Sequence, residues 1–497
     1  MPDEHIPVIV GIGEITDRPA DLQRSLEPLA LMAAALERAG EDAGHDLMRG
    51  VDSLDVVNLV SWRYADAAHQ LTERLGLAPR RAVYGPVGGE SPVRYLHEAA
   101  LRIARGESEV AAIAGAEAQS TVAKATKAGC ELPWTPLDGP RSLRGPDYLH
   151  PLAVKLGVAM PVSVYPFYDA ATAQHWGQTP RAALAESGDL WAKYAGVAAA
   201  NPAAWIKQRF SAAEIITPSA DNRLIAWPYT KLMVANPMVN QGAAVLMTSL
   251  ARAESAGIQA ERIIHIWGGA AANEPRDYLQ RDQYYESHAQ NAVLETALAI
   301  AQGGPFDALE LYSCFPCVPK MARRTLGLGA EVEPTVTGGL TFFGAPLNNY
   351  MTHAACAMVR RLREGAGIGL LYGQGEFVTK HHGLVLASRP PTRLLQSWNI
   401  SVQAEADKRR GTVPPFLVAA IGPASLETFT VIFDRDGAVN HGVVILRTAA
   451  GGRALARVPA ADGHTLGLLT DLDQSPLGID GVLSPTADGI SDWQARS

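Results

Sequence analysis

Cysteine is scarce in this chain of 497 residues. Its four cysteines, at positions 130, 314, 317 and 356, are too scattered for a disulfide framework, so we expect a reducing compartment. Cys314 and Cys317 form a CxxC pair, but a zinc site needs a second such pair or a histidine pair, and a redox site needs a thioredoxin-like context. Neither is evident in the sequence. We therefore expect no metal ion.

Long apolar runs and long basic runs are also missing. The longest apolar stretches, such as residues 366–371, are too short to cross a bilayer, and the opening MPDEHIPVIVGIG is typical of a strand rather than a signal peptide. The formal net charge is −8, and no basic run exceeds residues 408–410. We therefore expect a cytoplasmic protein with neither a membrane nor a nucleic acid as its partner.

Strands and helices alternate along most of the chain, whose length predicts two or three domains. The alternation starts afresh near residue 258, with little identity between the two passes. We infer an α/β protein with two similar halves that face each other around a site. The predicted strands cover residues 7–12, 51–60, 110–114, 241–249, 262–267, 308–311, 367–372 and 384–388; the predicted helices cover residues 25–39, 66–77, 92–105, 288–302, 320–326 and 352–362.

Two segments depart from this alternation. Residues 119–217 are rich in Pro, Trp and Tyr and predict a large insertion that covers a site. The last part of the chain has short alternating segments and turn signals, which predict a separate all-β barrel or sandwich with strands over 425–433, 442–447, 454–458 and 466–470. The expected domains are residues 1–257, with the insertion, residues 258–396 and residues 410–497.

The stretch FDALELYSCFPCVP, residues 306–319, is the strongest local signal for chemistry. A short apolar strand runs into Tyr312 and Cys314, and Pro316 prevents the strand from continuing. In α/β proteins, ligands bind at the loops that leave the carboxyl ends of strands. A phenol and a thiol on such a loop are candidates for chemistry, although a buried Cys and a packed Tyr are the ordinary alternative.

Five stretches together resemble the thiolase superfamily, particularly its sterol-carrier-protein-type members, over about residues 5–390. They are RGESEVAAIAGAEAQS at 105–120, NPMVNQGAAVLMTS at 236–249, the loop and helix at 311–328, GGLTFFGAP at 338–346 in the place of a Gly-His-Pro loop, and residues 369–375 in the place of a Cys-Gly loop.

This resemblance implies a fold, a substrate and an oligomeric state. It implies an α/β thiolase fold, with two halves packed as a layered αβαβα core, and a small C-terminal all-β domain similar to an oligonucleotide/oligosaccharide-binding barrel. It further implies an acetyl-CoA acetyltransferase-like activity, with a coenzyme A thioester as substrate and no tightly bound cofactor. Thiolases commonly pair through the N-terminal half, so a homodimer is expected.

The sequence lacks much of what thiolase chemistry requires. In the family a cysteine at a helix N-terminus takes the acyl group, a second cysteine moves a proton, and His and Asn stabilise the thioester oxygen. Gly89 stands at the nucleophile's position, Ala345 at the Gly-His-Pro histidine and Tyr372 at the second cysteine. Tyr312 replaces the His or Asn of the central loop, while Cys314 keeps a cysteine of that loop. An acyl-enzyme at residue 89 is therefore impossible.

Polar residues remain on the loops that match the family's site. Cys314, Tyr312 and His353 are the catalytic candidates, the first as a thiol and the other two as acid or base groups. For Glu90 a helix N-terminal charge is the favoured alternative, for His353 a satisfied helix histidine, and for residues 380–382 a solvated turn. The substrate-binding candidates are Glu90, Asn348, Tyr350, Tyr372, Gln374, Lys380 and His381.

Three functions fit these observations. The first is acyl transfer by a divergent thiolase that uses Cys314. The second is retro-aldol cleavage of a β-hydroxyacyl thioester, which needs a base and a stabilised enolate but no acyl-enzyme, and which suits a tyrosine at position 312. The third is a binding module that keeps the fold for a coenzyme A ligand or a protein partner.

Overall fold

The computed structural model describes residues 5–391 and 400–496, so the predicted domain limit at residue 396 lies outside the described residues. The N-terminal half forms around the strand β1 (Pro7–Thr16), against which helix α1 packs closely. At Gly13 an added Cβ would lie 2.0 Å from the carbonyl oxygen of Ala35, so this approach requires glycine. The other elements are α1 (Pro28–Ala43), α2 (His45–Arg49), β2 (Ser53–Val56), α3 (Ala67–Leu75), β3 (Arg81–Tyr84), α4 (Ser91–Ala104), β4 (Val110–Ala118), β7 (Asn240–Ser249) and α10 (Leu250–Ser255).

The C-terminal half repeats this order with one strand fewer. Its elements are β8 (Ile264–Asn273), α11 (His288–Ile300), β9 (Ala308–Leu311), α12 (Cys317–Thr325), α13 (Tyr350–Arg363), β10 (Ile368–Gly375) and β11 (Lys380–Ala387). In each half the last strand runs antiparallel to two neighbours, β7 to β1 and β4, and β11 to β8 and β10. The strands β2 and β9 correspond, because each pairs in parallel with the last but one strand of its half, β4 or β10.

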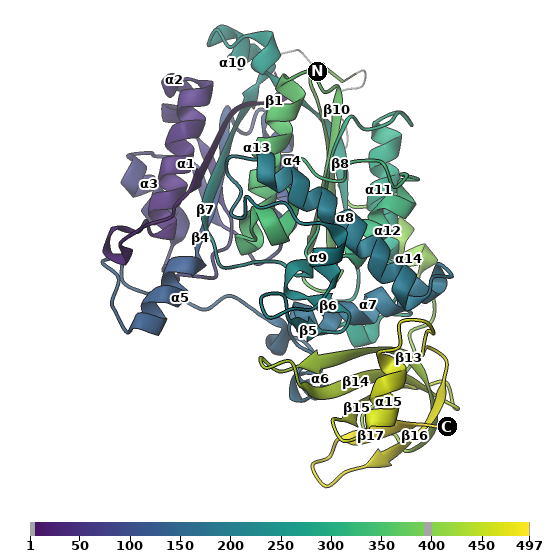
Figure 1. Ribbon diagram of the computed structural model, residues 1–497. Helices are drawn as coiled ribbons and strands as arrows, with labels where there is room; N and C mark the ends of the chain where they lie inside the picture. Colours follow the sequence, from purple (N-terminus) through teal and green to yellow (C-terminus); the bar gives the residue numbers. More distant parts are fainter. Residues whose placement is uncertain (1–4, 392–399, 497) are drawn as a thin grey trace.

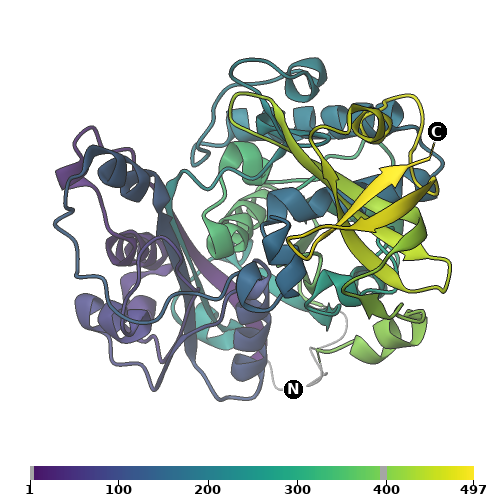
Figure 2. The ribbon, with the colours of Figure 1, turned by 90° about the horizontal axis from the view of Figure 1, so that it is seen from below.

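The two halves meet edge to edge and enclose a central helical layer. The strand order is β3-β2-β4-β7-β1-β8-β11-β10-β9, and only two residue pairs, Val8 with His265 and Ile9 with Ile264, join β1 to β8. Helices α4 and α13 lie between the halves and contact strands of both, with the N-terminal half on the left and the C-terminal half on the right in Figure 1. Figure 2 shows α13 between them from below. This arrangement confirms the predicted layered αβαβα core.

The predicted insertion is mostly helical. It contains α5 (Gln119–Ala128), α6 (Pro151–Lys155), α7 (Pro161–His175), α8 (Pro180–Ala200) and α9 (Ala212–Ile216), and the short strands β5 (Leu224–Ala226) and β6 (Tyr229–Thr230) follow beyond its predicted end at residue 217. Tyr194 of α8 donates a hydrogen bond to the carbonyl of Leu311 (2.8 Å), so the insertion reaches the carboxyl end of β9. Strand β5 pairs with β13, which connects the insertion to the C-terminal domain.

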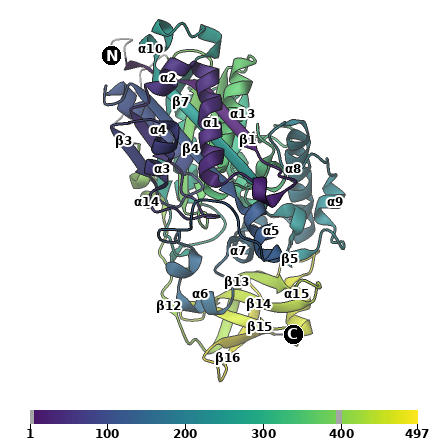
Figure 3. The ribbon, with the colours of Figure 1, turned by 90° about the vertical axis from the view of Figure 1, so that its left-hand side faces the viewer.

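The C-terminal domain is a small closed barrel, consistent with the predicted oligonucleotide/oligosaccharide-binding type, and it lies below α7 and β5 in Figures 1 and 3. Five strands close the ring in the order β13-β14-β15-β17-β16. Helix α14 (Gln403–Arg409) packs against α11 and β8 of the C-terminal half. The barrel domain contains β12 (Phe416–Leu417), β13 (Gly422–Phe433), β14 (Val439–Thr448), β15 (Arg453–Pro459), α15 (Gly463–Leu469), β16 (Asp480–Pro485) and β17 (Ser491–Ala495).

The strand predicted over residues 466–470 is wrong, because this segment belongs to helix α15. Asp462 caps the helix by accepting a hydrogen bond from the Thr465 backbone N–H (3.0 Å). Leu466 and Leu469, three residues apart, are both buried against the barrel core. No helix in the part of the chain that the structure describes is long and apolar enough to cross a bilayer.

Candidate functional site

The site is centred on Gly89, just before helix α4. A Cβ added at this position would lie 2.4 Å from the carbonyl oxygen of Gln374 and 2.5 Å from the hydroxyl of Tyr312. Three segments that are distant in the sequence therefore meet here: the start of α4, the loop after β9 and the end of β10. The Tyr312 hydroxyl and the Gln374 carbonyl together fill the space that a nucleophilic side chain at position 89 needs.

Tyr312 is a buried phenol that faces the start of α4. Its residue is 7% exposed, and burial raises its pKa well above the usual range, with further increases from Cys314 and Glu90. Its ring packs edge-to-face on Tyr350, with 5.9 Å between centroids. Among the described residues no hydrogen-bond partner of its hydroxyl is found. At neutral pH this group is a protonated hydrogen-bond donor without an internal acceptor.

Glu90 is the second ionisable group at the start of α4. It is 7% exposed, and burial raises its pKa, while Lys380 and Arg94 act to lower it. Its Oε2 atom lies 2.2 Å from an added Cβ on Gly375 and accepts no hydrogen bond from the described residues. A buried carboxyl oxygen without a donor is costly unless it is protonated or a ligand supplies a donor.

Cys314 lies next to these groups but in an environment that disfavours a nucleophile. Its thiol donates to Gln374 Oε1 (3.4 Å), and burial raises its pKa to about 12. A nucleophilic thiol requires the opposite shift, toward the thiolate. The nucleophilic role predicted for Cys314 therefore lacks support from its surroundings.

We expect thiol alkylation to separate the four cysteines of the folded protein. Cys130 is partly exposed, whereas Cys314, Cys317 and Cys356 are buried. Iodoacetamide at pH 7.5 should therefore modify Cys130 first, and the other three only after unfolding in urea. Peptide mass spectrometry measures the sites. Rapid alkylation of Cys314 in the folded protein, suppressed by coenzyme A, would instead restore it as the nucleophile.

The sequence predicted a loop at Tyr372 and Gln374, but both residues lie in strand β10, which continues to Gly375. Alternation along the strand then directs their side chains away from α4. An added Cβ on Gly373 would lie 3.1 Å from the Cα of Glu90, on the opposite face. Tyr372 instead accepts a hydrogen bond from Gln290 of α11 (2.9 Å). The structure thus corrects the prediction that the Tyr372 side chain lines the site.

Lys380 and His381 lie on β11, so the alternative of a solvated turn is wrong. Lys380 Nζ donates to the carbonyl of Val87 (2.8 Å) and pairs with Glu376 (3.0 Å), which ties the hairpin to the loop before Gly89. His381 is 1% exposed, and burial lowers its pKa to about 4, so it is neutral. Its Nδ1 lies 2.7 Å from the Tyr372 hydroxyl, on the face away from α4.

The three candidates that follow the Gly-Ala-Pro turn have separate positions. Asn348 accepts a hydrogen bond from the Gly88 N–H (3.1 Å), which places it beside Gly89. Tyr350 donates to Glu310 (2.6 Å) and supports the ring of Tyr312. His353 lies 2.6 Å from Glu14 of β1. The predicted alternative for His353, a satisfied helix histidine, is met only at Nδ1, because the buried Nε2 has no hydrogen-bond partner among the described residues.

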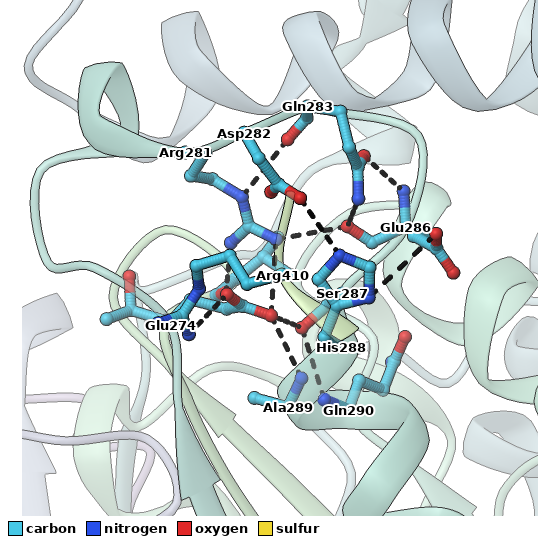
Figure 4. A network of polar contacts seen from close by, with 12 residues as sticks. Glu274, Arg281, Asp282, Gln283, Glu286, Ser287, His288, Ala289, Gln290 and Arg410 are labelled. Atoms are coloured by element: carbon cyan, nitrogen blue, oxygen red, sulfur yellow. Dashed lines mark hydrogen bonds and ion pairs between the residues drawn. The ribbon is translucent and has the colours of Figure 1, made fainter. Parts of the chain in front are cut away.

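Sequence reasoning missed the segment 274–287, which forms a buried charged network beside the site hairpin (Figure 4). Glu274 accepts hydrogen bonds from the Ser287 hydroxyl and the Ala289 N–H, both 2.9 Å, and pairs with Arg410 (3.2 Å). Arg281, 1% exposed, lies 3.6 Å from the same carboxylate. Several charges in the stretch EPRDYLQRDQYYES were the available signal, but their burial is not visible in the sequence.

The Glu274 carboxylate should contribute to stability in a pH-dependent way. Burial raises its pKa, but Arg281 and the donated hydrogen bonds overcome this and lower it to about 2. Because the pKa of the folded state lies below the unfolded value, the contribution is full above about pH 4.5 and is lost toward pH 2. In urea unfolding, Glu274→Gln should therefore be less stable than the wild type at pH 7, by a margin that shrinks on acidification. The exposed pair of Glu295 offers the control Glu295→Gln, and an equal margin for both variants would contradict the assignment.

Within residues 5–391 and 400–496, no group of three or more His, Cys, Asp or Glu side chains is placed to hold a metal ion. The site's polar groups are phenol, carboxyl, amide and backbone groups at a helix N-terminus. Such a set can stabilise negative charge on an oxygen and move a proton.

Comparisons with known proteins agree with this fold. Residues 402–485 match the family model described as the additional C-terminal domain of thiolase-like protein type 1. The crystal structure of a monomeric SCP2-thiolase like protein type 1 from Mycobacterium smegmatis is similar over 100% of both chains, at 27% identity and a TM-score of 0.84. A search among proteins with curated functions found no match.

More distant structures share the fold alone. An Ltp2-ChsH2(DUF35) aldolase is 19% identical, with a TM-score of 0.58, over 78% of this chain and 98% of that chain. Human mitochondrial 3-ketoacyl-CoA thiolase in complex with CoA is 15% identical, with a TM-score of 0.55, over 78% and 98%. Because the Mycobacterium smegmatis protein is monomeric, the comparisons give no support to the expected homodimer. The chain is therefore similar over its whole length to a thiolase-like protein type 1, and its residues 402–485 match the additional C-terminal domain of that type.

Proposed function

We propose that this protein binds a coenzyme A thioester between its two halves and cleaves β-hydroxyacyl thioesters by a retro-aldol reaction. The observation that carries the proposal is the position of the Tyr312 hydroxyl, which occupies the space of the missing nucleophile at Gly89. Retro-aldol chemistry needs proton transfer and enolate stabilisation but no covalent acyl-enzyme. A site that has exchanged a nucleophile for a phenol fits these needs.

In this reaction Glu90 acts as the base and Tyr312 as the hydrogen-bond donor. Glu90 takes the proton of the β-hydroxyl group, the Cα–Cβ bond breaks, and its electron pair moves into the thioester as an enolate. Tyr312, a neutral phenol, donates a hydrogen bond to the enolate oxygen, and the N-terminus of α4 favours that negative charge. The proton on Glu90 returns to Cα, which yields a shorter acyl thioester and a ketone or aldehyde. Burial raises the pKa of Glu90 toward the working pH of a general base.

Two structural neighbours are consistent with this chemistry. One distant relative in fold is an aldolase and another holds coenzyme A. Acyl transfer through Cys314 is less well supported, because burial raises the pKa of this thiol to about 12. The thioester remains a proposed substrate, and no tightly bound cofactor is needed for the steps above.

The test is product formation by the purified full-length protein. It is incubated with 3-hydroxyacyl-CoA substrates of several chain lengths and branching patterns, and chromatography with mass spectrometry follows both fragments. A carbonyl product and a shortened acyl-CoA should form in equal amounts, and intact-protein mass should show no acyl adduct. Adduct formation on Cys314 would overturn the proposal in favour of acyl transfer.

A binding module without chemistry is the second candidate, and one observation favours it. A Cβ added at position 89 would lie only 2.4 and 2.5 Å from neighbouring atoms, and the side chains around it are largely buried, so the described conformation offers little room. Calorimetric titration with a non-cleavable acyl-CoA thioether, together with the product assay, distinguishes the binding module from the aldolase. Tight binding combined with no carbonyl product from any 3-hydroxyacyl-CoA supports the module and contradicts the aldolase.

A further inference from the structure

The barrel domain contacts the backbone of residues 279–282 mainly through the buried Arg453, and Arg447 of β14 adds one hydrogen bond to the Asp282 carbonyl (3.2 Å). Arg453, on β15, is fully buried (0% exposed) and donates to the carbonyls of Leu279 (2.9 Å), Arg281 and Asp282 (3.3 Å). Glu427 of β13 orients the guanidinium through two hydrogen bonds of 3.0 and 2.7 Å. A planar guanidinium with several donors suits such a multiple contact. The barrel therefore fixes the backbone of this segment by directed hydrogen bonds.

The same segment holds the hairpin between β10 and β11. Arg281 Nη1 donates to the carbonyl of Val378 (2.9 Å), and the Glu274 N–H donates to the carbonyl of Thr379 (2.7 Å). Arg276 makes a bidentate contact with Glu376, at 2.7 to 3.0 Å. Arg281 therefore connects the barrel to the hairpin. Its carbonyl accepts a hydrogen bond from Arg453, and its guanidinium donates one to the carbonyl of Val378.

The turn of this hairpin has a strained backbone that neighbouring groups must keep in place. Glu376 and Val378 have φ angles of +60° and +55°, in the left-handed region that non-glycine and especially β-branched residues avoid. Such a conformation persists only where the surroundings fix it. The hairpin also carries the Gln374 carbonyl that closes position 89 and the Gly375 backbone that faces Glu90. A displaced turn would displace both groups.

We propose that the additional C-terminal domain works as a clamp in cis, which holds the hairpin of residues 374–380 in its strained form. The path runs from Arg453 to the backbone of residues 279–282 and from Arg281 to Val378. This assigns Arg453 and Arg281 as positioning residues and gives the barrel a role at the site without contact with a ligand. The proposal does not depend on which reaction the site performs.

The test measures amide hydrogen exchange in the full-length protein without substrate, by mass spectrometry. Arg453→Met combined with Glu427→Gln removes the hydrogen bonds of Arg453 and leaves in place the bond from the partly exposed Arg447 to the Asp282 carbonyl (3.2 Å). Peptides that cover residues 374–382 should then exchange about tenfold faster or more. The matched control is Arg457→Met with Asp492→Asn, an ion pair (2.8 Å) that joins β15 to β17 and, in the described part of the chain, makes no hydrogen bond to residues 279–282. The control should leave the hairpin unchanged.

Two further measurements separate a clamp from general loosening of the barrel. Arg281→Met with Glu274→Gln should also speed exchange of the hairpin, and combining both pairs should add little, because both pairs interrupt one path. In the wild type, exchange at rising urea should show the barrel and the hairpin opening with the same free energy. Faster exchange in the barrel alone, additive effects, or separate urea dependences would overturn the proposal, and the urea series does so even if a variant fails to fold.

Discussion

Replacing Tyr312 with phenylalanine should lower the turnover of a β-hydroxyacyl thioester by about 10²- to 10⁴-fold, the range expected for loss of a positioned proton donor. The ring would still pack on Tyr350, because that contact is between the aromatic faces and edges. The hydroxyl lacks a partner among the described residues, so its removal breaks no hydrogen bond of the described fold. Steady-state kinetics with the substrate found above measures the change, with thermal unfolding as a check on the fold.

Tyr372→Phe is the matched control for this variant. Its hydroxyl bonds with Gln290 (2.9 Å) and His381 (2.7 Å) on the face of β10 away from α4. Its loss should therefore cost stability, about 1 kcal/mol or more for buried hydrogen bonds, and leave turnover nearly unchanged. Equal losses of turnover in both variants would mean that the two tyrosines act together. Full activity in Tyr312→Phe would rule out its assigned role.

Sequence reasoning identified the elements because each half repeats strong local patterns. The apolar strand before Tyr312 was predicted with the bounds it has, 308–311, because the proline at 316 and the charged Asp307 limit it on both sides. Helix α4 was predicted within one residue at each end. Segments that match the family's site could therefore be expected close together, and the Tyr312 hydroxyl, the Gln374 carbonyl and Asn348 do lie around residues 88 and 89, whereas His353 contacts Glu14 instead.

The orientation of side chains was harder to predict than the positions of the elements. The end of β10 resembled a loop by its glycines at 373 and 375, whereas the structure continues the strand through both. Because alternate strand residues face opposite sides, this difference moves Tyr372 and Gln374 from the site to the far face. Only the backbone carbonyl of Gln374 remains at position 89.

Long-range pairing of charges was not accessible from one sequence. Arg281 lies in the C-terminal half and Arg453 in the barrel domain, so the two are far apart in the sequence. Buried arginines are rare, so local patterns predict both side chains as exposed. Their burial depends on carbonyls of a segment without regular structure, residues 279–282, to which Arg453 donates. The contacts between the barrel and this segment therefore could not be predicted from the sequence.

Replacing Gly89 with alanine should destabilise the protein by about 1–3 kcal/mol, the usual cost of an added methyl group in a packed site. The Tyr312 hydroxyl can move by a small rotation, but the Gln374 carbonyl, 2.4 Å from the added Cβ, belongs to the backbone of β10 and cannot. Urea unfolding measures the loss. Gly467→Ala is the control, because no atom lies within 4 Å of its added Cβ and alanine favours helix α15. It should be neutral or stabilising.

Gly89→Cys tests whether a thiol at position 89 can form an acyl-enzyme. The variant restores the residue type that thiolases use at the start of this helix, but the Cβ meets the same two oxygen atoms. We therefore expect a loss of stability like that of Gly89→Ala and no acyl adduct after incubation with acetyl-CoA, as measured by intact-protein mass. If the variant is as stable as the wild type and becomes acylated, then Tyr312 and Gln374 leave the nucleophile's place open. The loss of the cysteine would then be a simple substitution, and the case for Tyr312 as its chemical replacement would fail.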